Sequence, residues 1–303
     1  RDVLGSRGLG DVYKRQESDL IGAREIPAEA LYGVQTLRGI ENFSISKFRL
    51  SEYPLFIKGL AITKMAAAMA NFELGLLTVE QKDAIIAACG EILDGKHHDQ
   101  FPVDMIQGGA GTTTNMNANE VIANRALELM GYERGEYQYC SPNDHVNCSQ
   151  STNDAYPTAI HIGMYFKHLQ LLPHLEELIA SFRKKGEEFS QIIKMGRTQL
   201  EDAVPMTLGQ TFNGFASILQ DEIAHLNEAA ADFLVVNMGA TAIGTGICAE
   251  PGYAEKCIAA LREITGWDIR LSSDLVGATS DTSCLVGYAS AMKRVCVKMN
   301  KIC

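Results

Sequence analysis

The chain has 303 residues, of which 46% are hydrophobic and 21% charged, and its formal net charge is −10. Such an acidic protein is a poor match for nucleic acid or for an anionic membrane surface. No apolar run approaches the roughly 20 residues that span a bilayer, and no signal peptide is apparent, so the sequence predicts a cytoplasmic protein. The length favours two domains or one elongated domain over a single compact core.

The two ends of the sequence lack the usual boundary signals. Residues 1–16, RDVLGSRGLGDVYKRQ, have no clear period and are not continuous in pattern with the residues after them, so we expect a non-native leader. Residues 282–303 have a helical pattern that stops without a capping residue, glycine or proline. We therefore expect the chain to be a fragment of a longer protein.

The first third of the sequence contains two clear helix patterns. Residues 17–50 have mixed patterning with glycine and proline breaks, and predict short irregular pieces with room for a hairpin. Residues 53–74 carry a buried stripe among alanines and stop at Gly75, which predicts a helix. Thr78 and Gln81 then form a capping box, which predicts a second helix to about Leu93.

Metal and disulfide sites are not indicated. The eight cysteines include no CxxC pair and mostly lie in apolar helical context, as expected of reduced, buried thiols. His97, His98 and Asp99 lie in a loop and are metal-ligand residue types, but adjacent histidines rarely face one ion. A solvated loop is the favoured interpretation.

A polar stretch at 107–120, QGGAGTTTNMNANE, precedes a helix that is predicted to end at Gly131. Glycines let the backbone approach a ligand closely, and threonine and asparagine suit a helix cap better than a helix interior. The amide groups and the dipole of a helix N-terminus attract anions. The stretch therefore fits a cradle for a negatively charged group, and equally an ordinary polar loop with a helix cap.

Two further polar stretches precede helices. Residues 141–158 lead into a helix expected to start at Pro157, with a kink at Pro173, and to end at Gly186. Residues 194–207 are expected to be a loop, with Pro205 opening a helix of about thirty residues. A Gly/Thr/Ala-rich run at 238–252 and two helices complete the sequence. These long helices predict a mainly α fold with an extended bundle.

If the three polar stretches meet in space, they form a site of neutral donors at helix N-termini, which suits a small carboxylate substrate. A phosphate-binding P-loop is not indicated, because no lysine follows the glycines near 108–114. A serine nucleophile elbow is not indicated either, because no GxSxG motif occurs. Arg197 is the only arginine in these stretches. It is a candidate for a bidentate carboxylate contact, with a surface arginine as the alternative.

The motifs GGAGTTTNMNANE, NDHVNCSQSTNDAYPTA, MGRTQLEDAVPMTLGQ and GATAIGTG resemble, in this order, the signature regions of the fumarase and aspartase superfamily. The resemblance covers about residues 17–303. Within the superfamily, YGVQTLRGIENF, QSTND and GRTQLEDAVP resemble the aspartate ammonia-lyase branch. Fumarases typically have SSND and a histidine where this chain has Thr152 and Gln199, so the resemblance favours the aspartate ammonia-lyase branch, with fumarase as the nearest alternative.

The resemblance implies reversible elimination of ammonia from L-aspartate to give fumarate, through Cβ proton abstraction and an aci-carboxylate intermediate. It implies a small α-rich N-terminal domain at 17–140 and a long-helix central bundle at 141–303. It also implies a homotetramer whose active sites are shared between subunits. No organic cofactor is implied, although some aspartases are activated by a divalent cation.

The superfamily's substrate contacts can be carried over only to matching positions. The positions that match a substrate-binding role are Thr112, Ser151, Thr152, Asn153, Thr198 and Gln199. Weaker candidates are Arg24, Asn115 and Arg197, while Asn115 and Asn117 could equally shape or cap the helix. Because Gln199 stands where the superfamily often has histidine, only a hydrogen-bonding role is expected there.

The superfamily's third signature, a mobile GSS-x-MP-x-K-x-NP loop that carries the serine base, has no counterpart before Cys303. No catalytic base is therefore predicted within the chain, and we expect the 303-residue chain alone to be inactive. A non-catalytic helical relative is the alternative from a different class. It predicts degraded loops, whereas these polar stretches are intact.

Overall fold

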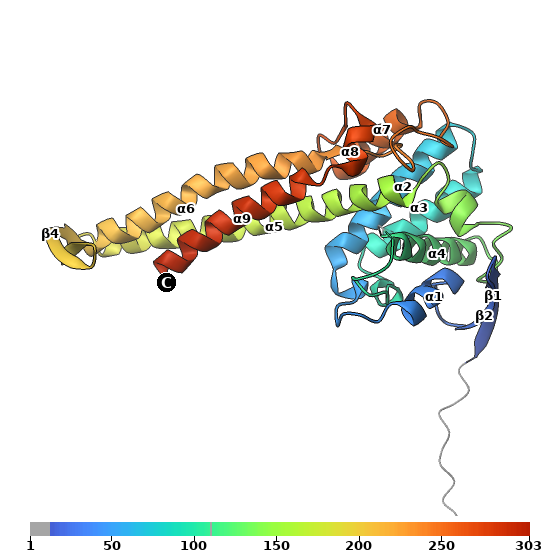
Figure 1. Ribbon diagram of the computed structural model, residues 1–303, viewed down its shortest axis with the longest axis horizontal. Helices are drawn as coiled ribbons and strands as arrows, with labels where there is room; N and C mark the ends of the chain where they lie inside the picture. Colours follow the sequence, from blue (N-terminus) through green and yellow to red (C-terminus); the bar gives the residue numbers. More distant parts are fainter. Residues whose placement is uncertain (1–12, 110) are drawn as a thin grey trace, which may run out of the picture. The chain divides into compact units, whose positions relative to one another are not determined.

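The computed structural model describes residues 13–109 and 111–303, and the described chain is mainly helical (Figure 1). Contacts divide the chain into two compact units, the first formed by residues up to 163 together with 236–279, the second by 164–235 and 280–303. This division differs from the predicted boundary at 140. The reason is that α5 (Thr152–Glu188) begins in the first unit and continues into the second as one helix.

The helices and strands follow one another in a mostly helical order. Their bounds, besides α5, are β1 (Lys14–Asp19), β2 (Gly22–Pro27), α1 (Val34–Asn42), η1 (Leu50–Glu52), α2 (Pro54–Glu73), α3 (Val79–Leu93), η2 (His98–Gln100), α4 (Thr112–Leu129), η3 (Pro142–Val146), β3 (Ile193–Thr198), β4 (Glu201–Thr207), α6 (Leu208–Ala231), η4 (Asp232–Leu234), β5 (Val235–Val236), α7 (Tyr253–Thr265), β6 (Arg270–Leu271), α8 (Leu275–Ser280) and α9 (Ser283–Ile302).

The first unit opens with the antiparallel hairpin β1–β2, in which Lys14 pairs with Pro27. Arg15 donates to the carbonyl oxygens of Ala30, at 2.5 Å, and Tyr32, at 2.7 Å. The predicted break after residue 16 is therefore wrong in its position, because residues 14–16 belong to β1. Residues 1–12 of the predicted leader lie outside the described residues, and a non-native origin stays a prediction.

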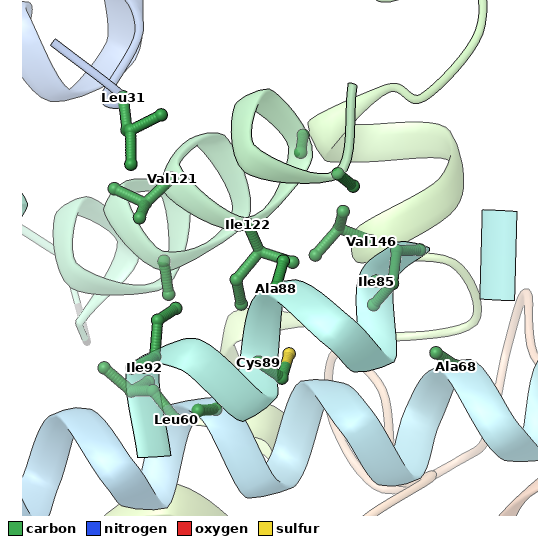
Figure 2. Packing of buried hydrophobic residues seen from close by; sticks show 14 of the residues in the cluster. Leu31, Leu60, Ala68, Ile85, Ala88, Cys89, Ile92, Val121, Ile122 and Val146 are labelled. Carbon is green, nitrogen blue, oxygen red and sulfur yellow. The ribbon is translucent and has the colours of Figure 1, made fainter. Parts of the chain in front are cut away.

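The core of the first unit lies between α2, α3 and α4 (Figure 2). Leu60 of α2, Ile85 and Ile92 of α3, and Val121 and Ile122 of α4 are all at most 1% exposed. The predicted helices at 53–74 and 78–93 are confirmed, and the capping box of Thr78 and Gln81 is present. Local signals were sufficient here, because the first helix has an apolar stripe and a glycine stop and the second begins at a capping box.

Helix α2 contacts the start of α5 at close range. A Cβ atom added to Gly59 would lie 2.3 Å from the carbonyl oxygen of Ala159, so only glycine permits this approach. By length and composition α2 is also the one described helix that could cross a membrane, but 67% of its apolar window is buried in the protein. Burial of that kind is typical of a core helix.

The N-terminus of α1 is capped by carboxylates distant in sequence. Its own N-cap residue, Gly33, offers no side chain. The Glu120 carboxylate on α4 instead accepts the backbone N–H groups of Gly33 at 2.8 Å, Gln35 at 2.8 Å and Thr36 at 3.0 Å. Glu17 of β1 accepts the N–H of Val34 at 3.1 Å. These bonds satisfy amide groups that every helix start leaves open.

In the second unit, a buried apolar cluster joins the later part of α5 with α6 and α9. Leu219 and Leu226 of α6 and Phe233 are at most 1% exposed. His168 of α5 lies 3.2 Å from the Tyr288 hydroxyl and 3.1 Å from the Asn227 amide oxygen, so it is a hydrogen-bonded core histidine.

The prediction for residues 194–207 is wrong in structure. These residues form the antiparallel hairpin β3–β4, and Pro205 lies in β4 opposite Met195 rather than at a helix start. A strand with only one neighbour tolerates proline. Thr207 and Gln210 form the capping box of α6, which therefore begins at Leu208.

Candidate active site

The first polar stretch builds the N-terminus of α4. Gly111 has φ of 86°, and a Cβ there would lie 2.5 Å from the Tyr156 ring, so both backbone conformation and space require glycine. Gln107 caps the helix, because its Oε1 accepts the N–H of Thr114 at 2.8 Å and its Nε2 donates to Thr114 Oγ1 at 2.8 Å. Thr112 is the exposed first residue of α4. It lies at the helix end whose free amide groups attract anions.

The first and second polar stretches meet through amide side chains. Asn115 of α4, 1% exposed, donates from Nδ2 to Thr152 Oγ1 and to Asn147 Oδ1, both at 3.1 Å. Asn119, one turn further along α4, donates to the same Asn147 oxygen at 3.2 Å. The first two polar stretches thus lie together within one chain, at the starts of α4 and α5, whereas the resemblance implied that the stretches meet across subunits.

A lysine that the sequence analysis did not single out lies behind these amides. Lys64 of α2 is 0% exposed and donates to Asn147 Oδ1 at 2.9 Å and to Gln150 Oε1 at 2.8 Å. Burial lowers the pKa of this amine from 10.5 to about 7, an effect that the charge of Asp154 partly opposes. The sequence does mark Lys64 as unusual, because it is a single lysine within the apolar run LAITKMAAA. Its partners are more than eighty residues away, so the sequence alone does not reveal them.

Ser151 and Asp154 form a reciprocal cap at the start of α5. Ser151 Oγ accepts the N–H of Asn153 at 3.2 Å, and Asp154 Oδ1 accepts the N–H of Ser151 at 2.9 Å. Asp154 Oδ2 also accepts the N–H groups of Gly239 at 3.2 Å and Thr241 at 2.9 Å. Burial raises the pKa of Asp154 from 3.8 to about 6, against the opposing effect of these N–H donors.

The Gly/Thr/Ala-rich run is fixed to the second polar stretch by further bonds. Asn153 Nδ2 donates to the Ala242 carbonyl at 2.8 Å, and Asn237 Nδ2 donates to the Asn153 carbonyl at 3.1 Å. Two predicted substrate contacts, Ser151 and Asn153, therefore have structural partners in this arrangement. Thr152 differs, because its oxygen accepts from Asn115 and no described residue accepts its hydroxyl hydrogen.

The third polar stretch lies in the second unit. Thr198 ends β3, and Gln199 and Leu200 form a two-residue turn with φ of 45° and 71°. Two positive φ angles characterise a type I′ hairpin turn, which asparagine and glycine usually occupy. A non-glycine pair there is a strained backbone of the kind found at functional sites. Thr198 and Gln199 are exposed, and Arg197 lies 3.3 Å from Asp202 across the hairpin.

Arg24 and the candidate metal ligands take no part in the amide network. Arg24 is exposed on β2, 3.7 Å from Glu41 of α1. His97 Nε2 lies 2.8 Å from Glu91, and His98 Nε2 lies 2.9 Å from the Ile92 carbonyl. Across residues 13–109 and 111–303, no group of three or more His, Cys, Asp or Glu side chains is placed to hold a metal ion.

The network has spare acceptors. Within the described part of the chain, the buried Oδ1 atoms of Asn115 and Asn119 have no hydrogen-bond partner. Buried polar groups are normally satisfied by protein, water or ligand. The Thr152 side chain, bonded to this buried amide network, and the exposed start of α4 with Thr112 are donors of a kind that suits a small anionic ligand.

A family model described as lyase matches residues 22–303. The chain belongs to this lyase family. Aspartate ammonia-lyases of Pseudomonas canavaninivorans and Escherichia coli K12 are 54% and 52% identical over 290 residues, 95% of this chain and 61% of each relative. The chain therefore spans less than two thirds of the length of these curated relatives.

Solved structures of the family have the same fold. Fumarate lyase:delta crystallin from Brucella melitensis, in its cobalt-bound crystal structure, has a TM-score of 0.94 and 50% identity, covering 96% of this chain and 63% of that one. The class II fumarase of Schistosoma mansoni has a TM-score of 0.91 and 31% identity, covering 96% and 64%. The predicted mainly α fold class and the resemblance to the fumarase and aspartase superfamily are confirmed. The roles of the individual site residues stay predictions.

Proposed function

We propose that the protein catalyses the reversible elimination of ammonia from L-aspartate to give fumarate. The observation that carries this function is the bond from Asn115 Nδ2 to Thr152 Oγ1, because it joins two polar stretches into one binding region at the starts of α4 and α5. Relatives that are 52–54% identical are named aspartate ammonia-lyases.

In this reaction a base removes a proton from Cβ of aspartate, and the electron pair passes to the neighbouring carboxylate, which becomes a doubly charged aci-carboxylate. When this electron pair moves back from the carboxylate, the Cα–Cβ double bond forms, the Cα–N bond breaks and ammonia leaves. Donors that bind the extra charge more tightly than the ground state lower the barrier. We assign this role to the Thr152 hydroxyl and the first turn of α4 with Thr112, and no described residue is assigned as the base.

We propose the hairpin turn with Thr198 and Gln199, in the second unit, as a further substrate-contacting region, contributed to the site of another subunit. Its strained two-residue turn and the exposure of both side chains support a contact with ligand rather than a packing role. We extend the proposal to a cytoplasmic homotetramer with shared sites, which light scattering tests through the mass in solution.

The reaction needs no electron carrier, so we propose no organic cofactor. Activation by a divalent cation is tested by assaying the chelated protein with and without added Mg²⁺.

Fumarate formation from L-aspartate, followed by ultraviolet absorbance, tests the activity on the protein encoded by the complete gene. Product from aspartate, and none from malate, is the expected result. The alternative is a class II fumarase-type hydratase, favoured by the 31% identical fumarase structure, and it predicts the opposite preference. Absence of turnover with both substrates, and of any thermal stabilisation by fumarate, would favour a non-catalytic relative.

A further inference from the structure

Lys64 is the most unusual buried group in the first unit. Lysine is almost never fully buried unless it is paired, yet Lys64 is 0% exposed on the apolar helix α2. Among residues 13–109 and 111–303 it has no carboxylate within ion-pair distance, and the partners of its amine are the neutral amide oxygens of Asn147 and Gln150. A packing role alone does not explain a charge at this position, since an aliphatic side chain would fill α2 at lower cost.

A short chain of hydrogen bonds connects this amine to the predicted ligand contacts. Lys64 Nζ donates to Asn147 Oδ1, which also accepts from Asn115 Nδ2, and Asn115 Nδ2 donates to Thr152 Oγ1. Lys64 thus fixes the side-chain orientation of Asn147. Asn147 then turns the amide hydrogens of Asn115 toward Thr152, whose own hydrogen is left for a ligand oxygen.

We propose that Lys64 is a positioning residue for the dicarboxylate substrate: its ammonium form aligns Asn147, Asn115 and Thr152, and its charge favours a dianion at their outer side. This inference rests on the function proposed above. It supplies a positive charge that the polar stretches lack in the first unit, where a protein of net charge −10 must attract a doubly negative ligand.

The charge of Lys64 responds to pH in the neutral range. Because burial lowers its pKa to about 7, the amine loses its proton as the pH rises from about 7 to 9. A bound dianion favours the ammonium form, and by reciprocity the ammonium form favours the dianion. We therefore expect dicarboxylate affinity to fall as the pH rises through this range.

The ionisable groups that act on Lys64, and those with shifted pKa values on α7 and η3, titrate outside this range. They are Cys89 (α3), Asp154 (α5), Tyr253 and Cys257 (α7), and His145 (η3). The pKa is about 6 for Asp154 and about 12 for the thiols of Cys89 and Cys257. The pKa of His145 is lowered from 6.5, and the pKa of Tyr253 is raised well above 10. Burial is the main cause of each of these shifts. On α4, Asn115 and Asn119 are uncharged, and Glu120, whose pKa burial raises, accepts the N–H groups at the start of α1. Glu91 of α3 and Glu128 of α4 pair with Arg125, and their pKa values are lowered.

The ligand for the test is succinate, a dicarboxylate with neither an amine nor a double bond, so that it does not react and stays ionised above neutral pH. Its dissociation constant is measured by calorimetry between about pH 7 and 9 on the protein encoded by the complete gene. The variants are Lys64→Met, which removes the charge, and Lys58→Met as the matched control. Lys58 lies on the same helix and is only partly buried.

We expect the wild type and Lys58→Met to lose at least about tenfold in affinity across this range. Lys64→Met is expected to bind weakly at every pH, at the level the wild type reaches at high pH. If Lys64→Met does not fold, a pH-independent succinate affinity in the wild type overturns the inference by itself. It is likewise overturned if Lys64→Met keeps the wild-type affinity and pH profile.

Failure of the proposed function gives a different result. A wild type that forms no fumarate from aspartate and binds no succinate at any pH removes the function on which the inference rests. A wild type that forms fumarate but shows no dependence on Lys64 removes the inference alone.

Discussion

The two compact units hold a buried charge in opposite ways. In the first, Lys64 has only amide oxygens as partners, and its pKa falls to about 7. In the second, the 0% exposed carboxylate of Glu222 on α6 has two cationic partners on α9, Arg294 at 2.9 Å and Lys298. Hydrogen bonding to Arg294 is the main reason why the pKa of Glu222 falls to about 2.

The difference separates a structural charge from a responsive one. Glu222 stays ionised near neutral pH, and its ion pairs join α6 to α9. Lys64 changes charge near neutrality, and it is connected to the predicted ligand contacts. A buried charge without a counter-ion is costly, and such cost is typical of functional sites.

The largest expected effect is on the pH dependence of stability through Lys64. In the unfolded chain the lysine pKa returns to its ordinary value of 10.5, so between about pH 7 and 10.5 the unfolded state binds more protons than the native state. The free energy of unfolding should therefore rise with pH across this range, by about 4 kcal/mol at most. Urea unfolding at several pH values measures the rise.

Lys64→Met should remove this rise, and Lys58→Met should keep it. Equal pH slopes in all three proteins would show that the pKa of Lys64 in the native state is not lowered below its ordinary value. Because stability rises where succinate affinity is expected to fall, loss of binding at high pH cannot be attributed to unfolding.

The next largest effect concerns Glu120, which caps α1 from α4. Replacing Glu120 with alanine leaves three buried or half-buried N–H groups without an acceptor, and we expect a loss of about 3 kcal/mol of unfolding free energy. Glu120→Gln keeps one acceptor oxygen and should cost less. Thermal and urea unfolding measure both variants.

The comparison for Glu120 is Thr78→Ala, which removes an ordinary local cap from α3 and should cost about 1 kcal/mol. Finding no larger loss for Glu120→Ala would mean that water replaces the carboxylate at the start of α1.

In the second unit, Glu222→Gln should cost about 2 kcal/mol near neutral pH, because both cations lose their counter-ion while half of Arg294 remains in solvent. The folded pKa is below the unfolded value, so this stabilisation is complete above about pH 4.5 and is lost as the pH falls toward about 2. Acid unfolding of the wild type and of Glu222→Gln should therefore converge. The exposed neighbour Asp221 provides the control Asp221→Asn, and an equal cost for both would contradict the role of burial.

The sequence predicted those parts of the fold that local signals determine. Helices α2 and α3 followed from an apolar stripe, a glycine stop and the capping box of Thr78. The hairpin at 193–207 was missed, because Pro205 suggested a helix start and the Gln199–Leu200 turn lacks the usual asparagine and glycine.

The candidate site was predictable only in part, for a related reason. The polar stretches with Thr112, Asn115 and Thr152 are continuous in sequence and were recognised. The buried partners Lys64 and Glu120 act on residues more than eighty positions away, and no pattern in one sequence links such positions. For the same reason the sequence did not predict the structural contact of Asn153, whose side-chain amide donates to the carbonyl oxygen of Ala242.

The smallest expected stability effect separates the exposed hairpin from the buried polar stretches. Thr198→Ala removes an exposed side chain at the end of β3, so unfolding free energy should change by less than about 0.5 kcal/mol. Thr152→Val removes the acceptor of a buried amide and should cost about 1 kcal/mol of unfolding free energy.

If both threonines contact the substrate, both variants should lower the rate of fumarate formation by at least about tenfold, since each loses a donor to the developing charge. Lys194→Ala on the same hairpin controls for exposure alone, because Lys194 is exposed and has no assigned role. Full activity in Thr198→Ala together with reduced activity in Thr152→Val would confine the site to the first unit. Reduced activity in both, with stability lost in only one, would show that the exposed hairpin binds substrate without contributing to the fold that carries it.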